Sequence, residues 1–128
     1  MNAEKSQLDE IGAWWGSPLL DAGWTVLPNA LARYQAELGL TASEINLIFQ
    51  LFTFRRGSGI FPSVPSVAER MGISERQVQN IARSLERKGY LKRRTRYTAL
   101  GRQSSNIYDF SGLMDKLQFL IARDLDEP

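Results

Sequence analysis

The feature that most constrains this chain is a glycine, Gly72, between two stretches with helical periodicity. Before it, Val67, Ala68 and Met71 recur on one face of a short helix that residues 63–66 would open. Glycine adopts the left-handed conformation that ends helices at little cost, so Gly72 can close this helix with a sharp turn. The sequence therefore predicts a helix–turn–helix near the middle of the chain.

The second helix of this motif is predicted over residues 75–88. Ser74 and Gln77 have the spacing of a capping box, and Gly89 closes the helix. The apolar face consists of Val78, Ile81, Ala82 and Leu85. The candidate DNA-binding residues of the helix and its cap are Ser74, Arg76, Gln77, Gln79, Asn80, Arg83 and Arg87. Arginine pairs with guanine, and Asn and Gln pair with adenine, so this helix is predicted to enter the major groove. The alternative is a solvated helix face, which would more often mix Glu and Lys.

A basic hairpin is predicted after this helix. Residues 90–97 have a strand-like composition at their ends, residues 99–105 read as a loop, and residues 106–110 alternate apolar and polar side chains. Two antiparallel strands in this place form the wing of a winged helix. The predicted DNA contacts of the wing are Lys92, Arg94, Arg96 and Arg102. Alternation puts Arg93 on the other face of its strand, and the same charges also suit an edge strand that resists aggregation.

The charge distribution favours a polyanion as the partner. The net charge is only +2, but residues 55–102 contain twelve basic and three acidic residues. Residues 1–54 contain two basic and six acidic residues, and residues 103–128 contain two and five. Because the basic block coincides with the helix–turn–helix and its wing, we expect double-stranded DNA to bind there.

Composition argues against catalysis. The 128 residues include no Cys and no His, which excludes thiolate chemistry and removes the commonest general base and metal ligand. The turn residues Gly57–Gly59 lack the Lys of a phosphate-binding loop. We therefore expect no enzyme, no cofactor and no metal. The chain has neither a long apolar run nor a signal peptide, so we expect a cytoplasmic protein without membrane contact.

Two further helices are predicted before the motif. The first begins at Pro28 and ends at Gly39. The second begins at the capping-box pair Thr41 and Glu44 and should stop by the turn residues 57–59. The basic residues expected at its carboxyl end are Arg55 and Arg56.

Both ends of the chain carry apolar residues. In the N-terminal arm, residues 14–18 (WWGSP) read as a short segment or turn and not as a long helix. Near the other end, Ser111 can cap a C-terminal helix with one apolar face. That face contains Leu113, Leu117, Leu120 and Ile121. Each end can pack on its own domain or on a second copy. We predict a homodimer whose recognition helices lie about one DNA turn, roughly 34–36 Å, apart.

Several short motifs between residues 23 and 110 are shared with one known family. They are Gly23–Leu31 (GWTVLPNAL), Phe61–Ala68 (FPSVPSVA), Met71–Val78 (MGISERQV), Leu85–Leu91 (LERKGYL) and Ser105–Tyr108 (SNIY). Together they resemble the winged helix-turn-helix domains of plasmid and phage replication initiators, and MarR-like regulators share the turn and the wing.

The resemblance implies a mainly α fold with a small β-hairpin wing, in which Arg76, Gln79, Asn80 and Arg83 face the bases. It divides the chain into an N-terminal arm (1–22), a DNA-binding winged helix (23–110) and a C-terminal helix and tail (111–128). A replication initiator is the expected function. A transcriptional repressor of the same fold, or a winged-helix protein-interaction module, is the alternative.

Overall fold

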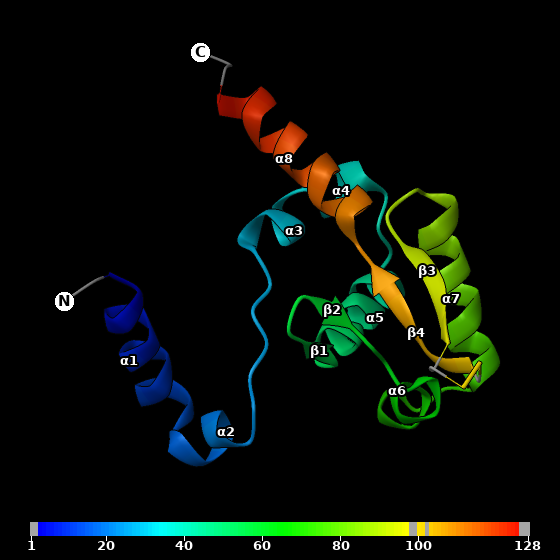
Figure 1. Cartoon of the computed structure of the whole chain (residues 1–128). Helices are drawn as coiled ribbons and strands as arrows, with labels where there is room; N and C mark the ends of the chain where they lie inside the picture. The colour runs from blue at the N-terminus through cyan, green and yellow to red at the C-terminus, as the bar shows by residue number, and fades with distance from the viewer. Residues whose placement is uncertain (1–2, 98–99, 102, 126–128) are drawn as a thin grey trace.

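A computed structural model of the chain describes residues 3–97, 100–101 and 103–125 (Figure 1). Its helices are α1 (Ala3–Trp15), α2 (Ser17–Asp21), α3 (Asn29–Arg33), α4 (Gln35–Leu38), α5 (Ala42–Phe52), α6 (Val64–Met71), α7 (Glu75–Arg87) and α8 (Ser111–Leu125). Its strands are β1 (Arg55–Arg56), β2 (Gly59–Ile60), β3 (Lys92–Tyr97) and β4 (Gln103–Asp109).

The architecture is a winged helix, as the sequence predicts. Helices α5, α6 and α7 pack together, and the antiparallel sheet has the strand order β1-β2-β4-β3. Ile60 of β2 pairs with Tyr108 of β4, so the short β1–β2 hairpin extends the wing into a four-stranded sheet. The fully buried aliphatic side chains at the centre are Leu47, Ile48, Leu51, Val67, Val78, Leu85 and Leu120. The fold prediction of a mainly helical domain with a small β wing is confirmed.

The turn between α6 and α7 has the predicted geometry. Gly72 has a φ of 68° and a ψ of 34°, which is the left-handed conformation. Ser74 and Gln77 form the predicted capping box at the start of α7, and Thr41 and Glu44 form the one at the start of α5. These local signals fix where the two helices begin.

The arm differs from its prediction, because α1 is a helix of 13 residues. Strong helix formers, including Ala3, Glu4 and Gln7, precede the Trp pair. The turn begins only at Gly16, whose φ of 83° breaks the helix before the short α2. The expectation that residues 14–18 exclude a long helix was wrong, since the helix ends within that segment and not before it.

Residues 28–56 also differ from their predicted elements. The helix expected from Pro28 to Gly39 is divided at Tyr34 into α3 and α4. Arg55 and Arg56 do not end α5 but form β1, which pairs with β2 across a two-residue turn. A φ of 60° at Gly57 permits this tight reversal, and a helical pattern cannot reveal the pairing.

Helix α8 packs on the same core as the winged helix. Leu113, Leu117 and Leu120 are buried in that core. A Cβ at Gly112 would lie 2.1 Å from the Gly89 carbonyl oxygen, so only glycine permits this close approach. Ser111 is not the cap residue that was predicted. Its backbone N–H donates instead to the Asp109 carboxylate (2.8 Å), and these bonds lower the pKa of Asp109.

The arm lies apart from the winged helix. Figure 1 shows α1 and α2 beside the body of the domain, joined to it by an extended segment before α3. Trp14 is 84% exposed and Val26 is 68% exposed. A cleft of about 630 Å³ between the arm and α5 is lined mainly by Ile11, Trp15, Leu19, Trp24, Val26 and Phe49. This face is the largest apolar region that the described residues leave uncovered.

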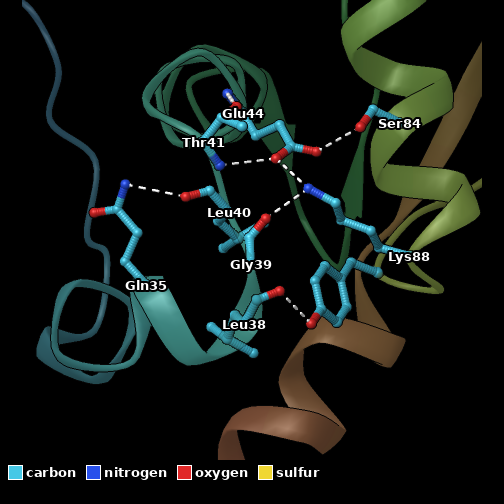
Figure 2. Close-up of polar contacts among 9 residues, drawn as sticks. Gln35, Leu38, Gly39, Leu40, Thr41, Glu44, Ser84 and Lys88 are labelled. Carbon is cyan, nitrogen blue, oxygen red and sulfur yellow. Dashed lines mark hydrogen bonds and ion pairs between the residues drawn. The ribbon is translucent and has the colours of Figure 1, made fainter.

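A buried carboxylate connects α5 to α7 (Figure 2). Glu44 is only 2% exposed, although it belongs to a capping box. Its Oε1 accepts hydrogen bonds from the Thr41 backbone N–H (2.8 Å) and from Lys88 Nζ (2.6 Å). Its Oε2 accepts one from Ser84 Oγ (2.8 Å). Lys88 Nζ also donates to the Gly39 carbonyl (2.6 Å), so one cluster fixes the carboxyl end of α7 to the turn before α5.

Burial raises the pKa of Glu44, but the hydrogen bonds from Lys88, Thr41 and Ser84 outweigh this effect and lower its pKa overall. The carboxylate is therefore ionised at neutral pH. A buried charge that keeps all these partners stabilises the fold only while the partners remain in place.

We expect Gly72→Val to lower the free energy of unfolding by about 1 kcal/mol or more. No described atom lies within 4 Å of a Cβ built at this position, so the cost comes from the left-handed backbone itself. Thermal melting measures the effect, and Gly72→Asn, which tolerates this conformation, is the control. A valine variant as stable as the parent would contradict the prediction.

We expect Glu44→Gln to lower the free energy of unfolding by about 2 kcal/mol or more at pH 7. Because the folded-state pKa is lowered, the contribution of Glu44 is complete above the ordinary carboxyl pKa of 4.5. It is lost as the pH falls through the lowered pKa. Below about pH 4.5, the parent should therefore lose stability more steeply than the variant.

Urea unfolding from pH 7 down to about pH 3 tests this expectation. Glu37→Gln is the matched control, because Glu37 is exposed and pairs with Arg123 on the surface. Equal acid slopes for the parent and Glu44→Gln would show that the buried carboxylate does not contribute as argued.

Candidate nucleic-acid interface

Helix α7 separates its side chains into a core face and a basic face. Val78, Ala82 and Leu85 are buried. The opposite face, called here the basic face, has the helical spacing i, i+4, i+7 and i+11. It consists of Arg76, Asn80, Arg83 and Arg87, and all four are exposed. The structure therefore brings together four of the predicted DNA-binding residues on one accessible surface.

The other predicted residues of α7 have intramolecular partners. Gln77 Oε1 accepts from the Ser74 backbone N–H (2.9 Å), and Ser74 Oγ accepts from the Gln77 backbone N–H (3.1 Å). Both residues are exposed, but their polar groups hold the start of the helix. Gln79 is half-buried, and its Oε1 accepts a hydrogen bond from Arg93 of β3. Gln79 thus lies on the flank of α7 that faces the wing.

Arg93 joins the wing to α7, a role that sequence analysis did not identify. Its Nε and Nη2 donate to Glu86 Oε1 (3.1 and 2.6 Å), and its guanidinium lies 5.7 Å from the centre of the Tyr108 ring. Burial lowers the pKa of Arg93, but the bonds to Glu86 and Tyr108 outweigh it and raise that pKa. Strand alternation predicted that Arg93 turns away from its neighbours, and only the tertiary structure supplies its partners.

The two faces of β3 carry different basic residues, as alternation predicts. Lys92 and Arg94 are exposed, whereas Arg93 is half-buried. Arg94 Nη2 lies 3.9 Å from Asp109 Oδ2 on the neighbouring strand, a loose surface pair. Arg96 belongs to β3, but its side chain lies outside the described residues, and Arg102 lies outside them altogether.

A second basic cluster lies beside the β1–β2 hairpin. The Arg70 guanidinium lies 4.6 Å from the centre of the Phe54 ring, and its Nη1 donates to Thr53 Oγ1 (3.1 Å). The Arg56 guanidinium lies 5.6 Å from the centre of the Phe61 ring. Sequence analysis assigned these arginines no functional role, and their aromatic contacts are those of surface cations packed on rings.

Within the described part of the chain, no group of three or more acidic residues is placed to hold a metal ion. None of the helices described there is long and apolar enough to cross a membrane.

Comparison with known proteins gives a family. The DnaD N-terminal domain matches residues 27–126, which include the winged helix and α8. A search among curated proteins finds no significant match.

Two solved structures resemble this chain. One is the crystal structure of the N-terminal domain of DnaD protein from Geobacillus kaustophilus HTA426. It has a TM-score of 0.63 and 23% identity, and the match covers 97% of this chain and 94% of that one. The other is the crystal structure of YusO protein from Bacillus subtilis, with a TM-score of 0.39 and 18% identity, and the match covers 98% of this chain and 84% of that one.

The first structural match supports the fold, and it extends over the arm that the family match leaves out. The family match covers most of the chain. The chain belongs to the DnaD N-terminal domain family, a family of replication-protein domains.

Proposed function

We propose that this domain binds double-stranded DNA through the basic face of α7 and the β3–β4 wing, as part of replication initiation. The observation that carries the proposal is the basic face itself, where Arg76, Asn80, Arg83 and Arg87 are exposed together. Three cations on one side of a helix that ends a helix–turn–helix suit entry into the major groove.

The position of the wing supports the same proposal. Figure 1 shows β3 running beside α7, and the Arg93 bridge holds the two together. Lys92 and Arg94 then supply exposed charge next to the basic face. Arg96 and Arg102 remain predicted phosphate contacts near the tip of the wing.

Membership of the DnaD N-terminal domain family favours replication over a transcriptional repressor. Plasmid or phage replication and a cytoplasmic location remain predictions from the sequence. We assign residues 1–22 to an assembly arm, residues 23–110 to the DNA-binding winged helix and residues 111–128 to a C-terminal helix and tail. In this assignment the domain needs no catalytic group.

A second activity, self-association, is favoured by a separate observation. The cleft between the arm and α5 exposes apolar side chains from both, and Trp14 and Val26 are more than two-thirds exposed. We propose that a second copy of the chain covers this face and forms a homodimer with two recognition helices. Such a dimer would place the helices about one DNA turn, roughly 34–36 Å, apart.

We expect Arg83→Ala to weaken binding to a preferred duplex by about 1–3 kcal/mol and to relax sequence preference, because an arginine on the basic face is lost. Affinity measured at several salt concentrations tests this expectation. Lys116→Ala is the charge-matched control, since Lys116 is exposed on α8 and contacts Phe119. Binding that does not weaken with salt, or an Arg83 variant indistinguishable from Lys116→Ala, would contradict the proposal.

We expect Trp15→Ser combined with Val26→Ser to convert a dimer to a monomer while leaving the winged helix folded. The two changes remove apolar surface from the open cleft and not from the core. Light scattering at micromolar concentration, with and without DNA, measures the mass, and a thermal melt verifies folding. Leu100→Ser is the control, because Leu100 is exposed far along the chain near the wing. A parent that is monomeric in both conditions would exclude the dimer.

A further inference from the structure

The carboxamide side chains of α7 share an unexpected property. The helix has three of them, Gln77, Gln79 and Asn80, and each oxygen accepts a hydrogen bond from the chain itself. In Gln77 the donor is the Ser74 backbone N–H, and in Gln79 it is Arg93. In Asn80 it is Arg83 Nη1, at 2.8 Å from Oδ1.

The orientation of these amides follows from their donors. A guanidinium and a backbone N–H can only donate, so the atom that faces each of them has to be the amide oxygen. The NH₂ groups of Gln79 and Asn80 therefore point away from the arginines. What these side chains offer a ligand is N–H donors.

Carboxylates do not restore acceptors to the basic face. Glu86 accepts two hydrogen bonds from Arg93. Glu75 shares the flank of Gln79 and Glu86, because residues 75, 79 and 86 have the spacing i, i+4 and i+11. Arg76, Asn80, Arg83 and Arg87 thus form a surface whose accessible polar groups are donors.

We propose that α7 reads guanine and discriminates against adenine, because the basic face presents hydrogen-bond donors only. This inference rests on the proposed binding of duplex DNA and specifies the base that is selected. It differs from the sequence-based expectation that Gln79 and Asn80 read adenine.

The edges of the bases explain the selection. In the major groove guanine presents two acceptors, N7 and O6, whereas adenine presents the N7 acceptor beside the N6 amino donor. A bidentate contact of Asn or Gln with adenine needs both the amide oxygen and the amide nitrogen. Arg83 already occupies the oxygen of Asn80, and a second guanidinium, that of Arg93, occupies the oxygen of Gln79. The adenine amino group would then face donors and positive charge.

The experiment begins with duplexes selected from a random pool by the whole chain. Each guanine in the selected site is then replaced by 7-deazaguanine, which lacks the N7 acceptor, and each adenine by 7-deazaadenine. We expect 7-deazaguanine to weaken binding about tenfold at one or two positions, the loss of one good contact. We expect 7-deazaadenine to change affinity less than about twofold.

Two variants separate the readers from their neighbours. Arg83→Ala should reduce the preference for guanine over adenine about tenfold, because it removes a donor and frees the Asn80 oxygen. Asn80→Ala should not weaken binding to adenine-containing sites selectively, since the oxygen of Asn80 is already occupied. Both side chains are exposed, so neither variant is expected to disturb folding.

The outcomes distinguish this inference from the proposed function. Salt-dependent duplex binding without a guanine preference, or a selective loss of adenine sites in Asn80→Ala, would overturn the guanine assignment and leave DNA binding intact. The absence of salt-dependent binding to any duplex would overturn both.

Discussion

The buried carboxylate of Glu44 is the interaction on which the orientation of α7 depends. It accepts hydrogen bonds from Ser84 and Lys88, both in the carboxyl-terminal part of α7 and its cap, and from the turn before α5. A carboxylate inside the core is stabilising only if several donors compensate its desolvation. Since those donors come from two helices, satisfying the charge also fixes the angle at which α7 leaves the core, and with it the direction of the basic face.

A second arginine-centred cluster fixes the wing relative to the same helix. Arg93 binds Glu86 and Gln79 while it stacks on Tyr108, so β3 cannot move far without leaving a half-buried cation unpaired. Glu44 on one side and Arg93 on the other therefore hold α7 from both flanks. The exposed residues between them are free to contact a ligand, and the carboxamides near them have their oxygens engaged.

The apolar surface has a different distribution. The winged helix and α8 close a continuous core, with Gly112 against the Gly89 carbonyl as the closest point. The arm and the cleft beside α5 remain exposed and are not needed to complete that core. The basic and apolar surfaces thus lie on different elements, so DNA binding and self-association can be tested by separate substitutions.

The sequence by itself determined the elements with strong local signals. Capping boxes at Thr41 and Ser74, the left-handed Gly72 and the periodicity of residues 75–87 depend on neighbours along the chain, and the structure agrees with all of them. Only the tertiary structure decided the pairing of Arg55 with Ile60, the burial of Glu44 and the partners of Gln79. These depend on residues distant in sequence, whose approach no local pattern encodes, and they decide which polar atoms of the predicted site remain available to a ligand.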